Sequence, residues 1–178
     1  KKLDLVEKAS SEIGEGIIIF PEGANFSNTL AKFLDEKSIQ KYFNDLSSKE
    51  LLIIDSIRTT VGDNYRSRVA LIGSQTGLIK TYDKQILSPG GEFLPYIVKY
   101  PLILLNPSLL ESFKFYRQYS SGFDSSKISY GNTDFNLVIC AELISPTKIH
   151  QSNGNFNIIV GSFSIWGGSN LATSQALA

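Results

Sequence analysis

The sequence predicts a layered α/β fold. Short runs of consecutive apolar, often β-branched residues alternate with longer segments of helical periodicity, which is typical of sheets covered by helices. The chain has 178 residues, of which 42% are hydrophobic and 19% charged, so it can build a substantial core. No internal repeat, low-complexity tract or long linker divides it. We therefore expect one domain over residues 1–178.

Two helices and two buried strands are expected in the first third of the chain. Residues 3–13 carry apolar side chains at helical spacing and end at Gly14, so they predict an amphipathic helix. Residues 17–20 are consecutive apolar residues, mostly β-branched, and predict a strand covered on both faces. Residues 29–46 look helical. Residues 51–54 form a second apolar run and predict another buried strand.

A β-hairpin and two further strands are expected next. Residues 69–72 and 78–82 flank the loop 73–77, whose length and glycines are typical of a hairpin. Residues 135–139 and 156–160 are also apolar runs and predict strands. This succession of short strands supports the α/β class.

The segment 93–119 is unusually apolar. Residues 102–105 are all aliphatic and lie between two prolines. The aromatic residues of the segment are Phe93, Tyr96, Tyr100, Phe113, Phe115, Tyr116 and Tyr119. The commoner arrangement for such a segment is a helix and loop packed on the core. The alternative is an exposed apolar lip that contacts lipid or an acyl chain.

Composition excludes several classes of function. The 17 basic and 17 acidic side chains leave no net charge, which argues against a nucleic-acid binder. One Cys and one His cannot supply the clustered ligands of a usual zinc site, and one Cys forms no internal disulfide. No run approaches the ~20 apolar residues that span a bilayer, and residues 1–4 lack the apolar core of a signal peptide, so we expect a soluble chain. The absence of Met indicates a piece of a longer protein or a sequence with residues missing.

Three of the apolar runs lead into a reactive side chain. Glu22, Lys84 and Cys140 each lie one or two residues past the end of such a run. In sheets covered by helices, functional sites gather where strands end, so these side chains could meet in one pocket. Each also has an ordinary interpretation, as a solvated loop carboxylate, a surface ammonium and a small core residue respectively.

If the three side chains meet, Cys140 is the candidate nucleophile and Glu22 is the candidate base for its proton. The ordinary pKa values of ~8.5 for Cys and ~4.3 for Glu oppose this transfer by about four units, roughly 5 to 6 kcal/mol. Burial raises the pKa of a carboxylate, whereas a nearby ammonium such as Lys84 lowers that of the thiol and stabilises an oxyanion. The rival Cys-His arrangement depends on His150, the only imidazole, in the polar stretch 146–155 that is expected at the surface.

The segments around these side chains resemble the signatures of carbon–nitrogen hydrolases, the nitrilase superfamily. The matching segments are 21–24 (Pro-Glu-Gly-Ala), 82–95 (from Tyr-Asp-Lys to Glu-Phe-Leu-Pro) and 139–142 (Ile-Cys-Ala-Glu). Within that superfamily the sequence is most similar to apolipoprotein N-acyltransferases, whose lysine segment reads Tyr-x-Lys, a short gap, Leu-x-Pro-Phe-Gly-Glu-Tyr and Pro. The eight-residue step from Lys84 to Glu92 is kept, and the resemblance runs from about residue 3 to the C-terminus.

The resemblance implies an incomplete four-layer α-β-β-α sandwich of the nitrilase type with a Glu-Lys-Cys catalytic triad. In it Glu22 is the general base, Lys84 the oxyanion stabiliser and Cys140 the acylated nucleophile. The supporting or substrate-binding residues are Glu92, Glu142 and Trp166. Because Glu92 and Glu142 add negative charge that opposes thiolate formation, we expect one of them to pair with the lysine or to stay protonated. No metal or organic cofactor is implied.

Three positions depart from the family pattern. Gly90 stands where a Phe is usual before Gly-Glu, and Ala141 replaces an aromatic residue that follows the Cys. Phe163 begins a Phe-Ser pair where Asn-Asp is common. These changes alter the pocket wall without touching the reactive trio, so they bear on the fit of the acyl chain and on the rate.

The function implied by the resemblance is an N-acyltransferase of lipoprotein biosynthesis at the bacterial inner membrane. Cys140 would take an acyl chain from a phospholipid as a thioester and pass it to the N-terminal amine of a diacylglyceryl-modified lipoprotein. The domain would face the periplasm, attached to the membrane through parts of the parent protein that this sequence lacks. Two alternatives stay open: a soluble amidase that uses the same trio on a small carbon–nitrogen substrate, and a binding domain that kept the fold and lost the activity.

Overall fold

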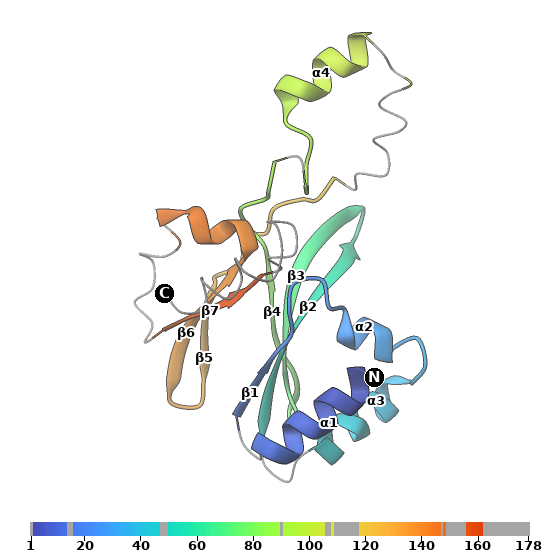
Figure 1. Cartoon of the computed structure of the whole chain (residues 1–178), viewed down its shortest axis with the longest axis vertical. Helices are drawn as coiled ribbons and strands as arrows, with labels where there is room; N and C mark the ends of the chain where they lie inside the picture. The colour runs from blue at the N-terminus through green and yellow to red at the C-terminus, as the bar shows by residue number, and fades with distance from the viewer. Residues whose placement is uncertain are drawn as a thin grey trace.

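The structure, a computed structural model, describes residues 2–13, 16–46, 50–89, 91–105, 108, 118–146, 148 and 156–161. Its helices and strands are, in chain order, α1 (Lys2–Ile13), β1 (Gly16–Ile19), α2 (Phe26–Leu30), α3 (Glu36–Leu46), β2 (Leu51–Val61), β3 (Asn64–Gly73), β4 (Gly77–Asp83), α4 (Tyr96–Leu105), β5 (Lys127–Tyr130), β6 (Thr133–Ile139), the short 3₁₀ helix η2 (Cys140–Ile144) and β7 (Phe156–Val160). Helices and strands are interspersed along the chain, as the α/β class predicts (Figure 1).

The first sheet contains β1, β2, β3 and β4 in that order. β1 pairs with β2 in parallel, whereas β3 is antiparallel to both of its neighbours. The predicted hairpin over residues 69–82 is confirmed as the β3–β4 pair. The predicted buried strand at 51–54 is confirmed within β2, where all of these side chains are fully buried. β2 and β3 extend beyond the apolar runs and are joined by a turn at Gly62, whose φ of 59° favours glycine.

The second sheet contains β5, β6 and β7, which confirms the strands predicted at 135–139 and 156–160. β5 and β6 form an antiparallel hairpin, and β7 is parallel to β6. The two sheets pack face to face through one apolar core, which fixes the ends of their strands relative to one another. Its buried residues are Leu52, Ile54, Val69, Leu71 and Tyr82 from the first sheet, and Ile128, Phe135, Leu137, Ile139, Ile158 and Val160 from the second.

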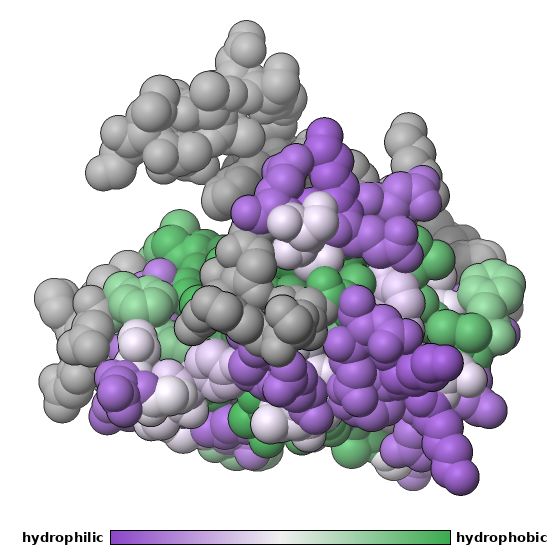
Figure 2. Space-filling view, turned by 90° about the horizontal axis from the view of Figure 1, so that it is seen from below, coloured by the Kyte–Doolittle hydropathy of each residue, from purple (hydrophilic) through white to green (hydrophobic). Residues whose placement is uncertain are grey.

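The helices α1, α2 and α3 cover the other face of the first sheet (Figure 1). Side chains along β2 alternate, so Leu52 and Ile54 face the second sheet whereas Ile53 faces the helices. The helix-side core consists of Val6, Phe26, Leu30, Phe43, Ile53, Ala70 and Ile72. The described residues therefore form three successive layers, of helix, sheet and sheet. Hydrophilic side chains cover much of the face seen from below (Figure 2).

The helix predicted over residues 29–46 is interrupted. α2 ends at Leu30, a turn follows, and α3 begins at Glu36. The side chain of Asp35 accepts a hydrogen bond of 2.7 Å from the N–H of Ser38, which caps the first turn of α3. Helix is therefore confirmed on either side of the turn, but the turn and this cap divide the predicted helix in two.

The strand predicted at residues 17–20 forms as β1, but it is not covered on both faces. Ile17 and Ile19 are 37% and 48% exposed, whereas Ile18 packs against the helix-side core. The physical reason is that β1 is an edge strand of the first sheet. Its helix-facing side is covered, and the opposite side is open.

The helix α4 stands away from the sheets at one end of the molecule (Figure 1). None of its residues is buried, and Ile97, Leu104 and Leu105 are 83%, 82% and 84% exposed. The expectation that the 93–119 segment packs on the core is therefore wrong for α4, and the alternative of an exposed apolar segment is confirmed there. Within the described ranges, no helix is both long and apolar enough to cross a membrane.

Candidate active site

The ends of three strands bring Glu22, Lys84 and Cys140 together. Glu22 follows β1 and Lys84 follows β4, both in the first sheet, whereas Cys140 follows β6 in the second. Because the two sheets pack face to face, a thiol from one sheet meets a carboxylate and an ammonium from the other. The structure thus places in one cluster the three side chains that the sequence singles out.

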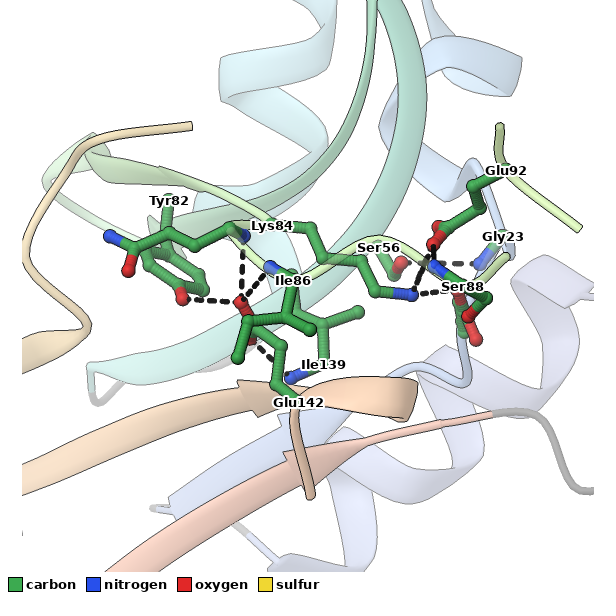
Figure 3. A network of polar contacts seen from close by, with 11 residues as sticks. Gly23, Ser56, Tyr82, Lys84, Ile86, Ser88, Glu92, Ile139 and Glu142 are labelled. Carbon is green, nitrogen blue, oxygen red and sulfur yellow. Dashed lines mark hydrogen bonds and ion pairs between the residues drawn. The ribbon is translucent and has the colours of Figure 1, made fainter. Parts of the chain in front are cut away.

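Lys84 is the centre of a buried group of charges (Figure 3). Its Nζ lies 2.9 Å from each carboxylate oxygen of Glu92 and 3.5 Å from Oε1 of Glu22. The residue is 1% exposed, so its ordinary interpretation as a surface ammonium is wrong. The backbone is held as well, since Lys84 N–H donates to Ser67 O and Lys84 O accepts from Gly122 N–H, both at 2.8 Å. Two carboxylates offset the cost of burying this cation.

The loop after β1 directs Glu22 toward the lysine. Gly23 adopts a φ of 72°, in the left-handed region that favours glycine, and its N–H donates to Ser56 Oγ at 3.1 Å (Figure 3). Beyond the loop, the buried carboxylate of Asp55 accepts hydrogen bonds from the first two N–H groups of α2. The loop that carries Glu22 is therefore tied to β2 through Gly23, and the Glu22 side chain itself is only 7% exposed.

Hydrogen bonds between Ser88 and Glu92 orient Glu92 toward the lysine. Glu92 N–H donates to Ser88 O at 2.9 Å, and Ser88 N–H donates back to Glu92 Oε2 at 2.7 Å (Figure 3). The carboxylate is thus oriented by the backbone before it meets Lys84. Of the two acidic residues expected to oppose thiolate formation, Glu92 is the one that pairs with the lysine.

Cys140 occupies a turn where β6 passes into η2. Its φ of 47° lies in the left-handed region, which costs a residue with a side chain about 1–2 kcal/mol. The thiol is half-buried and lies beside the Glu22 carboxylate. Burial raises the pKa of the thiol, and the negative charges of Glu22 and Glu92 raise it further, whereas Lys84 lowers it. The resting site therefore holds a neutral thiol next to the group that can accept its proton.

Glu142 joins the two sheets through a fully buried carboxylate (Figure 3). Its Oε1 accepts hydrogen bonds from Tyr82 Oη at 2.8 Å and from Gln85 N–H at 2.7 Å, and its Oε2 accepts one from Ile139 N–H at 2.9 Å. The first N–H follows the candidate lysine and the second precedes the candidate nucleophile. Burial, followed by the charge of Glu142, raises the pKa of Tyr82, so this hydroxyl remains a hydrogen-bond donor.

Several sequence-predicted residues lie outside the part of the chain that the structure describes. These are Trp166, His150, Gly90 and Phe163. Ala141 is described and is half-buried beside the nucleophile. The roles inferred for Trp166 and His150 therefore stay predictions.

Sequence reasoning missed two residues beside the site. In the sequence Tyr82 stands out only as part of the Tyr-x-Lys segment, and nothing distinguishes Lys148. The polar stretch 146–155 was expected at the surface, but Lys148 within it is 8% exposed, so this expectation is wrong at that position. No local signal reveals a buried lysine, because lysine is usually exposed and its burial here depends on partners far away in the sequence.

The arrangement can form and break an acyl–sulfur bond. It combines a candidate nucleophile, a neighbouring carboxylate that can act as a base and a cation that can stabilise an oxyanion. Among the residues that the structure describes, no three His, Cys, Asp or Glu side chains are grouped to hold a metal ion.

Solved structures with this combination of sheets and helices are similar to the chain over nearly all of its length. Nit3 of Saccharomyces cerevisiae, a member of branch 10 of the nitrilase superfamily, matches with a TM-score of 0.61 and 14% identity. The match covers 93% of this chain and 59% of Nit3. The chain has the nitrilase fold. The predicted fold class, an α/β sandwich of the nitrilase type, is therefore confirmed.

Two further structures show the same likeness. The glutamine-dependent NAD⁺ synthetase of Acinetobacter baumannii matches with a TM-score of 0.59 and 18% identity, over 99% of this chain and 31% of that protein. An amidase of Nesterenkonia, in a mutant with acrylamide added at its active-site cysteine, matches with a TM-score of 0.55 and 14% identity, over 93% of this chain and 64% of the amidase. The chain thus spans less than two thirds of the length of each of these proteins. No family model and no curated protein sequence matches it.

Proposed function

We propose that the chain is the catalytic part of an N-acyltransferase that moves an acyl chain from a phospholipid, through a thioester on Cys140, to the N-terminal amine of a bacterial lipoprotein. The observation that carries acyl transfer is the cluster itself: the Cys140 thiol lies beside the Glu22 carboxylate, and Lys84 Nζ lies 3.5 Å from that carboxylate. The nitrilase fold, shared with enzymes that have an active-site cysteine, supports the same chemistry.

The first half-reaction forms the thioester. Sγ of Cys140 attacks the ester carbonyl of the donor while the thiol proton passes to Glu22. Lys84 Nζ donates a hydrogen bond to the oxyanion of the tetrahedral intermediate. When the intermediate collapses, the ester C–O bond breaks and Glu22 returns the proton to the leaving alkoxide. The products are a lysophospholipid and acylated Cys140.

The second half-reaction releases the acyl group as an amide. The acceptor amine attacks the thioester carbonyl, Glu22 removes an amine proton, and Lys84 again stabilises the oxyanion. The C–S bond breaks, and the proton on Glu22 passes to the sulfur of Cys140. No cofactor is consumed. Attack by water instead of the amine would hydrolyse the thioester, so the site has to exclude water while it waits for the acceptor.

The exposed helix α4 supports a lipid as the donor. It begins four residues after Glu92, and its only charged residue is Lys99. The exposed aromatic and aliphatic residues along it are Tyr96, Ile97, Val98, Tyr100, Ile103, Leu104 and Leu105. Such a surface, close in sequence to a carboxylate that pairs with Lys84, suits an acyl chain or a bilayer better than a small polar amide. We therefore propose that the chain acts on the periplasmic side of the bacterial inner membrane, attached through other parts of its parent protein.

An amidase that hydrolyses a small carbon–nitrogen substrate is the second candidate. Its specific support is the likeness to the Nesterenkonia amidase, one of whose structures shows covalent addition of the acetamide moiety of fluoroacetamide at the active-site cysteine. In an amidase the same residues would act, but water would take the place of the acceptor amine. The identity of the acceptor therefore separates the two candidates.

The deciding experiment follows both half-reactions in the complete protein. The protein is incubated with a phospholipid that carries a labelled acyl chain, and the peptide containing Cys140 is analysed by mass spectrometry. A diacylglyceryl-modified lipopeptide is then added. We expect a labelled thioester on Cys140 that disappears as the N-acylated lipopeptide forms.

Variants and alternative substrates complete this test. Cys140→Ala and Glu22→Gln should abolish thioester formation, whereas Glu12→Gln, at a surface ion pair with Lys8, should not change it. Full acyl transfer by Cys140→Ala would end the proposal. Release of ammonia from small amides without any lipid thioester would identify an amidase. A Cys140 thiol that reacts with an acyl probe no faster than an ordinary thiol would indicate a binding domain without activity.

A further inference from the structure

Lys148 is a buried lysine that no step of the proposed reaction uses. Its Nζ donates a hydrogen bond to Oε1 of Gln85, and it lies 3.5 Å from Tyr82 Oη and 5.8 Å from the centroid of the Tyr82 ring. Burying an ammonium is costly unless polar groups and aromatic faces compensate it. The ammonium of Lys148 is therefore held by specific contacts within the protein and is not a solvated surface charge.

Hydrogen bonds connect Lys148 to the ends of β4 and β6, which carry the site. Through Tyr82, whose hydroxyl donates to Glu142 Oε1 at 2.8 Å, Lys148 is connected to the buried carboxylate that joins the two sheets. That carboxylate also accepts hydrogen bonds from the N–H groups of Gln85, Ile86 and Ile139. Lys148 is thus the positive end of a chain of hydrogen bonds that runs from Nζ to Tyr82 Oη and on to the negative carboxylate.

Gln85 gives Lys148 a second and shorter route to the catalytic lysine. Gln85 directly follows Lys84, and its side chain is held at both ends. Its Oε1 accepts from Lys148 Nζ, and its Nε2 donates to Asp124 O. The backbone N–H of the same residue donates to Glu142. Any shift of Gln85 therefore moves the backbone that carries Lys84.

We propose that Lys148 is a positioning residue that, through Tyr82 and Gln85, holds Lys84 at its working distance from Cys140. This inference rests on the proposed function only in that it takes Cys140 as the nucleophile and Lys84 as the cation beside it. Removing Lys148 leaves Tyr82 and Gln85 with unpaired acceptors and loosens the joint at Glu142. The predicted consequence is a weaker influence of Lys84 on the thiol, rather than loss of the fold.

The effect of Lys148 on the thiol is expected to be indirect. The charged groups that act on Cys140 are Glu22, Lys84 and Glu92. Lys148 has no direct contact with the thiol, so its removal can change the reactivity of Cys140 only by displacing one of those groups. This distinguishes positioning from a simple long-range effect of charge.

The test measures alkylation of Cys140 by iodoacetamide across neutral to alkaline pH, read from the Cys140 peptide by mass spectrometry of the complete protein. We expect Lys148→Met to slow alkylation at neutral pH about tenfold, the effect of raising the thiol pKa by about one unit. Lys148→Arg, which keeps the charge and the donors, should restore most of the rate. Lys127→Met, which removes a half-exposed lysine paired with Asp134 at 3.0 Å, is the matched control and should have no effect.

A double-mutant cycle tests whether Lys148 affects the thiol through Tyr82 and Gln85. Tyr82→Phe and Gln85→Met should each slow alkylation in the same direction, and adding Lys148→Met to the variant that carries both changes should slow it no further. Additive effects, or a wild-type pH profile for Lys148→Met, would overturn the proposal. If Lys148→Met does not fold, Lys148→Gln takes its place in the cycle.

This test is independent of the acyl donor and the acceptor. If the protein transfers no acyl chain at all, the alkylation profiles still report whether Lys148 positions the site. If the protein does transfer acyl chains, Lys148→Met should lower kcat and leave KM for the donor unchanged, because Lys148 contacts the machinery and not the substrate.

Discussion

The thiol of Cys140 lies beside Glu22, and the negative charge of Glu22 raises the pKa of that thiol. The same carboxylate therefore keeps the candidate nucleophile protonated at rest and is the candidate acceptor for its proton when the sulfur attacks. Lys84 acts in the opposite direction, since its positive charge lowers the thiol pKa. The reactivity of the site depends on the balance of these neighbouring charges, which single substitutions can shift separately.

Glu22→Gln is expected to separate thiol reactivity from catalysis. The raised thiol pKa means that alkylation of Cys140 increases with pH around a midpoint above that of an ordinary cysteine. Removing the negative charge of Glu22 should lower this midpoint, so alkylation at neutral pH becomes faster. Acyl transfer should nevertheless be lost, because the base is gone. Alkylation and acyl transfer are measured on one preparation. An alkylation midpoint that lies at higher pH in the variant would contradict the role given to the charge of Glu22.

Lys84→Met is expected to destabilise the fold and to make the thiol less reactive. It leaves Glu22 and Glu92 buried without their shared cation, which typically costs about 3–5 kcal/mol of unfolding free energy. The pKa of Cys140 should rise further because Lys84 no longer lowers it. Urea unfolding measures the first effect, with the surface variant Lys127→Met as a control that should change stability by less than about 1 kcal/mol. Equal stabilities for the two variants would refute the buried ion cluster.

The backbone strain at Cys140 predicts an unusual ranking of two inactive variants. Both Cys140→Ala and Cys140→Gly remove the thiol, but only glycine adopts a φ of 47° without strain. We therefore expect the glycine variant to be more stable than the alanine variant by about 1 kcal/mol, whereas glycine is usually the less stable of the two within regular structure. Thermal unfolding of the pair measures this difference. The usual order would mean that the turn is not strained.

Gly122→Ala is expected to disturb the site through the backbone. A Cβ at Gly122 would lie 2.4 Å from both Cβ and O of Asp83, the residue before Lys84, so the chain has to move apart there. Such overpacking typically costs about 1–3 kcal/mol, and here it also displaces the lysine. Gly91→Ala is the control, because the nearest atom to its new Cβ is at an ordinary 3.7 Å. A Gly122→Ala protein as stable as this control would show that the two segments are not in close contact.

Polar substitutions on α4 are expected to weaken the use of the lipid donor without changing the stability of the protein or the reactivity of the thiol. Leu104→Ser and Leu105→Ser replace side chains that are more than four fifths exposed, so the unfolding free energy should change by no more than about 0.5 kcal/mol. If α4 contacts the acyl chain or the bilayer, the KM for the phospholipid should rise while alkylation of Cys140 stays at the wild-type rate. Unchanged KM in the double variant would remove the lipid role of this helix.

The strands that could be predicted from the sequence are those that contain a run of buried apolar residues. The segment 51–54 has four consecutive buried side chains, and such a pattern has few interpretations other than a strand between two layers. β5 was missed because only Ile128 of its four residues is buried, so its sequence has no apolar run. The polar ends of β2 and β3 were missed for the same reason, since they are held by pairing with each other.

The reactive trio could be predicted because each member follows an apolar strand and the three occur in a familiar order. The supporting contacts could not. Glu142 acts through hydrogen bonds to backbone N–H groups, which any residue can provide and which leave no side-chain pattern. Lys148 is buried by partners more than sixty positions earlier in the chain, so only the folded arrangement reveals them.

The division of the site between two sheets has a consequence for the way the protein is made. Glu22 and Lys84 belong to the first sheet and leave the ribosome well before Cys140, which belongs to the second. A nascent chain that has completed only the first sheet holds the candidate base and cation but lacks the candidate nucleophile. The proposed activity would therefore arise only when the late strands dock, because an unfinished chain has no sulfur in place to be acylated.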